Sequence, residues 1–175
     1  MKKTDWKGIA ELIGIVAIVA SLIFVGLELR QSQMIAVASQ YQSRIGFNLQ
    51  YYDSFGEADF PVVGDRLKEE IAESSLPPDL KKEIQVMDSD SLGRTVIRFR
   101  KILYMFDNNH YQHQAGFVDG ESWNAMRARL MDLMRSRSPI AQALMKFEIV
   151  DRSYQWRESL NAEFGQMLLE AHGSN

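Results

Sequence analysis

The longest feature of the hydrophobic pattern is a continuous apolar stretch near the N-terminus. Residues 12–27 read LIGIVAIVASLIFVGL, sixteen positions without a charge. Extended to residues 9–29, the stretch would form a helix of about 31 Å, which matches the hydrocarbon core of a bilayer. Glu11 and Glu28 lie within a turn of its ends, and Trp6 precedes it at the position where an indole ring suits the headgroup layer. The pattern therefore predicts a transmembrane helix.

Two other kinds of segment produce a similar run. A secretory signal peptide has a basic start, like MKKTDWKG here, and a cleavage site such as AVAS at residues 36–39. This run is longer than a usual signal, and that site lies about ten residues past it, behind Glu28 and Arg30. A buried core helix normally has a polar face, and residues 12–27 have none. We therefore interpret the segment as a retained membrane anchor.

Small side chains recur along the predicted anchor. Their positions follow one another at intervals of four, three and four residues: Ala10, Gly14, Ala17 and Ser21. This spacing places them on one helix face, and small residues let helices approach closely in lipid. Two interpretations stay open. The stripe is a docking face for another span, or it reflects the general abundance of small residues in spans.

The helical pattern continues beyond Arg30. Apolar residues recur every three or four positions at Met34, Ala38, Tyr41, Ile45, Leu49 and Tyr52. The spacing predicts one helix that leaves the membrane and ends near residues 53–56. Gly56, Pro61 and Gly64 then predict a loop, followed by a short helix over residues 64–74.

Capping residues, proline and glycine divide the remainder of the chain. Pro78 and Asp79 predict the start of a long helix that runs to Gln114 and stops at Gly116. Its expected buried stripe is Leu92, Val96, Phe99, Leu103 and Phe106.

Three further helices are expected after Gly116. Asp119 caps the first, with Trp123, Met126, Leu130 and Leu133 inward; Ser138 and Pro139 open the second over residues 139–157; Asn161 caps the last, which ends at Ala171. No alternating strand pattern occurs. The sequence thus predicts an all-α fold, in which a tail and single transmembrane helix (residues 1–30) continue into a small helical bundle (residues 31–175).

Charge adds an orientation and a candidate surface. The net charge of −3 is modest and argues against nucleic-acid binding. Residues 57–90 carry ten acids and four bases, whereas residues 91–137 carry eight bases and four acids. Two interpretations are open for the basic stripe, which consists of Arg94, Arg98 and Lys101. It is a patch for anionic lipid or an acidic partner, or it is a face neutralised by the acidic segment.

The bases that flank the span favour a cytoplasmic N-terminus and a periplasmic domain. Three of them precede the span, Lys2, Lys3 and Lys7, and two follow it, Arg30 and Arg44.

Candidate chemistry is sparse. The chain has no cysteine and none of the common nucleotide-binding, hydrolase or zinc motifs, so we expect no catalytic residues, no cofactor and no enzymatic activity. Asp107, His110 and His113 are spaced three apart on a predicted helix, a spacing that metal sites use, but a second such motif is missing and we expect no metal. Together with Tyr111 and Gln112 these residues form either a small polar pocket or a polar helix end.

Two blocks of the sequence resemble a known group of proteins. AELIGIVAIVASLIFVGLELRQ resembles the N-terminal span of a group of small bacterial single-pass membrane proteins that have an all-helical remainder and no assigned activity. RFRKILYMFDNNHYQHQAGFVDGESW is similar to their second block, in which a Tyr-Gln pair, a glycine and an acid-to-tryptophan helix start correspond to Tyr111, Gln112, Gly116, Asp119 and Trp123. This chain has Asp107 where the group has glutamate, and fewer bases after the span. The resemblance implies a bacterial inner-membrane protein.

Two functions are therefore expected from the sequence. The first is an accessory or scaffolding subunit of a bacterial membrane complex, whose partners are other membrane proteins or a second copy of the chain, together with the lipid bilayer. The alternative is a membrane-tethered sensor that binds a small ligand or lipid between its helices. A closed apolar pocket near Tyr111, Gln112 and His113 would favour the sensor, and a core filled by Phe, Met and Leu would count against it.

Overall fold

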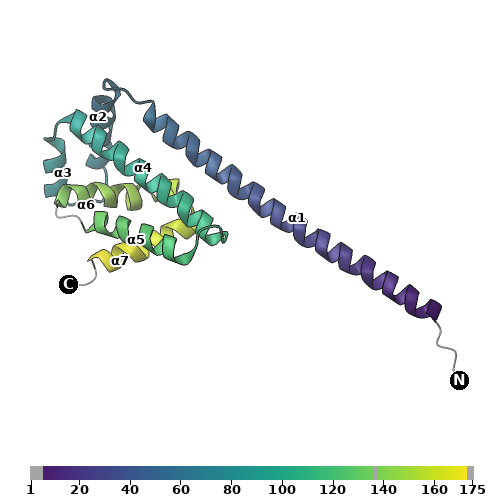
Figure 1. Cartoon of the computed structure of the whole chain (residues 1–175). Coiled ribbons are helices and arrows are strands. Elements are labelled where there is room, and N and C mark those ends of the chain that lie inside the picture. Colours follow the sequence, from purple (N-terminus) through teal and green to yellow (C-terminus); the bar gives the residue numbers. More distant parts are fainter. Residues whose placement is uncertain (1–5, 136–137, 173–175) are drawn as a thin grey trace. The chain divides into compact units, whose positions relative to one another are not determined.

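The computed structural model describes residues 6–135 and 138–172, and within these ranges the chain is helical and contains no strand. Seven α-helices are present in them: α1 (Trp6–Asp53), α2 (Asp59–Ala72), α3 (Pro78–Gln85), α4 (Ser89–Gln114), α5 (Gly120–Met134), α6 (Pro139–Lys146) and α7 (Glu158–His172) (Figure 1). A π-helical turn (Phe147–Asp151) and a 3-10 turn (Ser153–Gln155) join α6 to α7. The prediction of an all-α fold, with a long apolar N-terminal helix ahead of a helical domain, is confirmed. Lys2 and Lys3, on which the predicted orientation partly depends, lie outside the described residues.

The chain divides into two compact units, one up to Tyr41 and one from Gln42 onward. Helix α1 is continuous for 48 residues and ends at Asp53, as predicted. In the first unit every side chain of residues 6–37 is exposed. This helix is long and apolar enough to cross a membrane, and it is the one such helix among the described residues.

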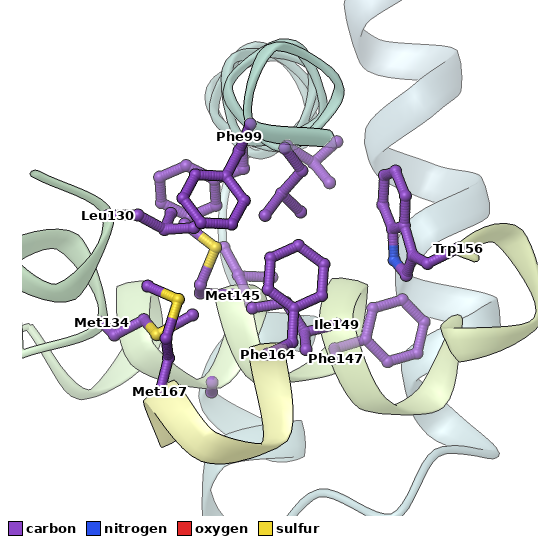
Figure 2. Close-up of a cluster of buried hydrophobic side chains, with 14 of the residues drawn as sticks. Phe99, Leu130, Met134, Met145, Phe147, Ile149, Trp156, Phe164 and Met167 are labelled. Carbon is purple, nitrogen blue, oxygen red and sulfur yellow. The ribbon is translucent and has the colours of Figure 1, made fainter. Parts of the chain in front are cut away.

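The second unit, which we call the helical domain, is built around one apolar core. Figure 2 shows Phe164 in the middle of this cluster, with Met134, Met145 and Met167 on one side and Phe147 and Trp156 on the other. The stripe predicted for residues 92–106 is buried throughout and supplies the α4 side of the core. Trp123 and Leu130 of α5 are also buried, whereas Met126 and Leu133 are half-buried.

Several predicted helix ends are confirmed by their hydrogen bonds. The Asp119 carboxylate accepts from the Ser122 N–H at 2.9 Å, and the Ser138 hydroxyl oxygen accepts from the Ala141 N–H at 3.3 Å. Gly116 follows α4 with a φ of 81°, a left-handed conformation that glycine adopts at little cost.

The predicted long helix over residues 79–114 is wrong, because it is two helices. Helix α3 ends at Gln85, and α4 begins after Asp88, whose carboxylate accepts from the Ser91 N–H at 2.9 Å. The Lys68 ammonium of α2 donates to the Met87 carbonyl oxygen at 2.6 Å. These bonds hold the connection in a non-helical conformation, and the second of them comes from a residue distant in sequence.

The loop predicted at Gly64 is also wrong. Helix α2 begins at Asp59, and Gly64 lies buried inside it. A Cβ atom at Gly64 would stand 1.9 Å from the Ser89 carbonyl oxygen, and one at Gly93 would stand 2.0 Å from the Phe60 carbonyl oxygen. Both glycines are therefore needed for a close backbone approach of α2 to α4.

The C-terminal helices differ from the prediction at two places. The segment predicted as one helix over residues 139–157 is α6 followed by the π-helical and 3-10 turns. The final helix begins at Glu158, so Asn161 does not cap it. Instead, the Asn161 amide donates to the Ser153 carbonyl oxygen at 3.0 Å and ties the 3-10 turn to α7.

Candidate functional site

The predicted docking stripe lies on the first unit. Ala10, Gly14, Ala17 and Ser21 all belong to the uninterrupted helix α1, and all four are exposed. A Cβ atom added at Gly14 would have nothing within 4 Å. The stripe is thus open to a partner helix, and larger side chains fit at Gly14 without disturbing the chain's own structure.

At the predicted polar pocket, the structure brings Asp107, His110 and Tyr111 around a residue that the sequence analysis did not include. The Arg157 guanidinium donates to one Asp107 carboxylate oxygen through Nε at 3.1 Å and Nη2 at 2.9 Å. The same group lies 3.4 Å from His110 Nδ1 and 5.1 Å from the centre of the Tyr111 ring. The space between these residues is therefore occupied by the chain's own arginine.

The two histidines of this cluster pack against tryptophan. The rings of His110 and His113 each lie 5.3 Å from the Trp123 ring, and the His113 ring is nearly parallel to it at 7°. His113 Nδ1 lies 2.9 Å from the Val118 carbonyl oxygen, to which it donates when protonated. Burial, and then the charge of Arg157, lower the pKa of His110. No three histidines or carboxylates in the described ranges are grouped so that they could hold a metal ion.

Gln112 contributes its backbone carbonyl group to the end of α4. Its carbonyl oxygen accepts from the Phe117 N–H at 2.8 Å and from the Val118 N–H at 3.3 Å. The turn at Gly116 brings these two N–H groups back toward the helix, as is typical of a glycine-terminated helix.

The predicted basic stripe lines an open groove of about 830 Å³ beside apolar residues that include Phe55, Phe60 and Ile102. Arg94 Nε is 2.7 Å from an Asp90 carboxylate oxygen, and its guanidinium lies 4.2 Å from the Phe60 ring centre. Lys101 pairs with Asp53. Arg98 is exposed and has no ion pair with any described residue. The stripe is thus partly neutralised by nearby acids, one of the two outcomes that the sequence left open.

A second polar cluster in the helical domain was missed by the sequence analysis. Glu148, in the π-helical turn, is 0% exposed, and its carboxylate accepts from Arg100 Nη2 at 2.9 Å and from Arg100 Nε at 3.1 Å. Arg152 Nη1 lies 3.6 Å from the same carboxylate, and Arg152 Nη2 lies 2.5 Å from a carboxylate oxygen of Glu70. We call these four residues the arginine–glutamate cluster.

The arginine–glutamate cluster borders a cavity of about 190 Å³ that is partly open to solvent. Its lining residues come from the end of α1, from α2 and α4, and from the turn after α6: Tyr51, Tyr52, Phe55, Val63, Arg66, Leu67, Glu70, Arg100 and Arg152. Burial, and then the neighbouring Tyr104, raise the pKa of Tyr52 to about 12. Its hydroxyl therefore keeps its proton at neutral pH.

One local signal could have pointed to this cluster. Glu148 stands in the sequence ALMKFEIV, where a carboxylate within an apolar run indicates a buried charge that needs a partner. The partner itself, Arg100, is 48 residues away and could not be identified from spacing.

The chain was also compared with known proteins. No protein-family model, curated protein or solved structure matches it. What the chain does is therefore inferred from its own residues.

Proposed function

We propose that this chain is a single-pass accessory or scaffolding subunit of a bacterial membrane protein complex. The observation that carries the proposal is the apolar part of α1: residues 12–27 have no polar face, and every side chain of residues 6–37 is exposed. Such a surface is stable in lipid, and in lipid it associates with other spans through close packing. The resemblance of residues 10–31 and 98–123 to small bacterial inner-membrane proteins supports the same placement.

The proposed orientation has the N-terminus in the cytoplasm and the helical domain in the periplasm. It follows from the bases of residues 2–7 and from the small number of bases after the span. The partner is another membrane protein or a second copy of this chain, bound at the stripe that contains Gly14 and Ala17.

The test is a pair of matched substitutions in the anchor. Gly14→Leu enlarges a residue of the stripe, while Gly26→Leu makes the same change about 120° around the helix from Gly14, at about 100° per residue. Neither glycine has any atom within 4 Å of an added Cβ, so neither change strains the chain itself. The tagged chain is extracted from its own membranes in mild detergent, and co-purifying proteins are quantified by mass spectrometry.

We expect Gly14→Leu to lower the ratio of bound partner about tenfold, because it blocks close helix approach, and Gly26→Leu to leave the ratio unchanged. For a homo-oligomer the same ratio is measured between two differently tagged copies. Equal retention of the partner in both variants would remove the stripe from the proposal.

A second candidate function, the membrane-tethered sensor, is favoured by the partly open cavity of about 190 Å³. The core in Figure 2 is filled by Phe, Met and Leu, and Arg157 fills the region near Tyr111, so the cavity beside Arg152 is the place for a ligand in this candidate. Ligand binding by the purified chain distinguishes the candidates, since docking in the membrane requires none.

A further inference from the structure

The cavity beside the arginine–glutamate cluster has the size of a small-molecule site. Its volume of about 190 Å³ somewhat exceeds the roughly 150 Å³ that holds a benzene molecule in an engineered apolar cavity. A ring with one substituent, or an aliphatic chain of a few carbons, fits such a space.

The polar wall of the cavity has more hydrogen-bond donors than acceptors. Each guanidinium has five N–H groups. Arg152 donates one hydrogen bond, from Nη2 to Glu70, and its Nε has no partner among the described residues. Arg100 directs Nε and Nη2 to Glu148, which leaves Nη1 without one. Arg152 Nε and Arg100 Nη1 are not among the buried side-chain atoms that lack a hydrogen-bond partner. Since neither has a partner, both are accessible to a ligand or water.

The charges around the cavity do not balance. Three guanidiniums, of Arg66, Arg100 and Arg152, face two carboxylates, of Glu70 and Glu148. The charge left over is that of Arg66, whose side chain is 79% exposed, because Glu148 and Glu70 match Arg100 and Arg152. A bound monoanion would neutralise it, whereas a dianion would leave the site negative.

The lining of the cavity also includes three aromatic rings. The rings of Tyr51 and Phe55 lie 4.9 Å apart at 73°, and those of Tyr51 and Tyr52 lie 5.4 Å apart at 60°. These rings offer apolar faces and edges to a ligand body. The lining of the site therefore combines guanidinium donors with aromatic surface.

We propose that this cavity binds a small organic monocarboxylate, with its carboxylate on Arg152 and Arg100 and its aromatic or short aliphatic body against Tyr51, Tyr52 and Phe55. Arg152 Nε and Arg100 Nη1 can each donate one charge-assisted hydrogen bond to such a carboxylate. The inference supplies the sensor candidate with a ligand class, and it is independent of docking through the anchor.

The experiment titrates para-fluorobenzoate against the full chain in lipid nanodiscs and follows binding by fluorine NMR. We expect saturable binding that is at least about tenfold tighter than that of para-fluorobenzyl alcohol, which has a similar shape and no charge. Inorganic phosphate should compete poorly, because it lacks an apolar body. Arg152→Gln should weaken benzoate binding by at least about tenfold.

Two further variants keep the test decisive if Arg152→Gln loses helicity by circular dichroism. Arg66 lines the cavity with a 79% exposed side chain, so Arg66→Gln should fold normally and weaken binding about two- to threefold. Arg129, an exposed arginine of α5 that does not line the cavity, provides the control: Arg129→Gln should leave binding unchanged. Absence of saturable benzoate binding, equal binding of the alcohol, or equal behaviour of Arg66→Gln and Arg129→Gln would each overturn the proposal. None of these results bears on partner retention by the Gly14 variant.

Discussion

The two units of this chain place their apolar residues in opposite surroundings. Ile18 and Leu22 of the first unit are 63% and 67% exposed, whereas Leu103 and Phe164 of the helical domain are 0% exposed. The helices of the domain have one apolar side, which they bury against one another. Residues 12–27 of the first unit are apolar on all sides, and no described neighbour covers residues 6–37.

This difference indicates that the two units need different solvents. An amphipathic helix is satisfied by a neighbouring helix and by water on its polar side. A helix that is apolar all round, with its backbone groups paired internally, is stable in hydrocarbon. With the proposed membrane-spanning first unit, exposure has opposite meanings in the two units: contact with lipid in the first and contact with water in the helical domain.

The largest effect is expected from charges placed on exposed positions of each unit. Ile18→Asp combined with Leu22→Asp should cost about 5–7 kcal/mol of membrane insertion, because each carboxylate would lie near the bilayer centre. The measurement is the fraction of chain that stays with the membrane after alkaline carbonate extraction. Val62→Asp combined with Val86→Asp is the control, at positions of the helical domain that are 67% and 79% exposed, and should not change that fraction. Equal extraction of the two double variants would contradict the proposed difference in surroundings between the first unit and the helical domain.

The next largest effect concerns the core of the helical domain. Phe164→Ala should lower the free energy of unfolding by about 3–5 kcal/mol, because it leaves a cavity in the middle of the cluster in Figure 2. Phe47→Ala, at a 72% exposed position, should change it by less than about 0.5 kcal/mol. Urea unfolding of the full chain in nanodiscs, followed by near-ultraviolet circular dichroism, measures both. A loss below about 1 kcal/mol for Phe164→Ala would contradict the core described above.

A smaller effect, with opposite signs at two glycines, tests the approach of α2 to α4. Gly93→Ala should destabilise the domain by about 1–3 kcal/mol, since its Cβ would meet the Phe60 backbone. Gly165→Ala, in α7 with nothing within 4 Å, should stabilise it by about 0.5–1 kcal/mol through helix propensity. The same unfolding experiment applies. A stabilising Gly93→Ala would show that the two backbones do not approach so closely.

The smallest effect is a pH dependence of the helical domain at His110. Burial and Arg157 lower its folded-state pKa below the ordinary value of 6.5, although the charges of Glu163 and Asp107 oppose this and that of His113 adds to it. The unfolded chain then binds the proton more strongly, so stability is fully present above about pH 6.5 and falls as the pH drops below it. Melting temperatures measured between about pH 8 and pH 5 should decrease more for the native chain than for His110→Gln. Identical pH profiles would exclude His110 as the source.

Much of the fold could be predicted from local pattern. The buried stripe of α4 follows helical periodicity, and the caps at Asp119 and Ser138 depend on residues only three positions away. The break between α3 and α4 could partly have been predicted from sequence, because Asp88 is a good helix cap. The hydrogen bond from Lys68 to Met87 depends on tertiary structure and could not. The roles of Gly64 and Gly93 depend on helix packing, which spacing along the chain does not reveal.

The candidate sites show the same limit. Neighbours on one helix, such as Asp107, His110 and Tyr111, were predicted to lie together, and they do so around Arg157. Arg157 lies 50 positions after Asp107 in the sequence, and Arg100 and Glu148 are 48 positions apart. Buried pairs of this kind are set by the packing of whole helices, so a single sequence indicates that a partner is needed but does not identify it.

The most direct test of the central claim uses the absence of cysteine from the chain, which allows single cysteines to be labelled without background. Ala20 in the first unit and Ala125 in α5 are both exposed, so Ala20→Cys and Ala125→Cys make the same change in the two units. Opened membranes are treated with a water-soluble maleimide, before and after the bilayer is dissolved in denaturing detergent. We predict that Ala125→Cys reacts at once, and that Ala20→Cys reacts only after the lipid is removed. Equal reaction of the two cysteines in the intact bilayer would contradict a membrane-spanning first unit.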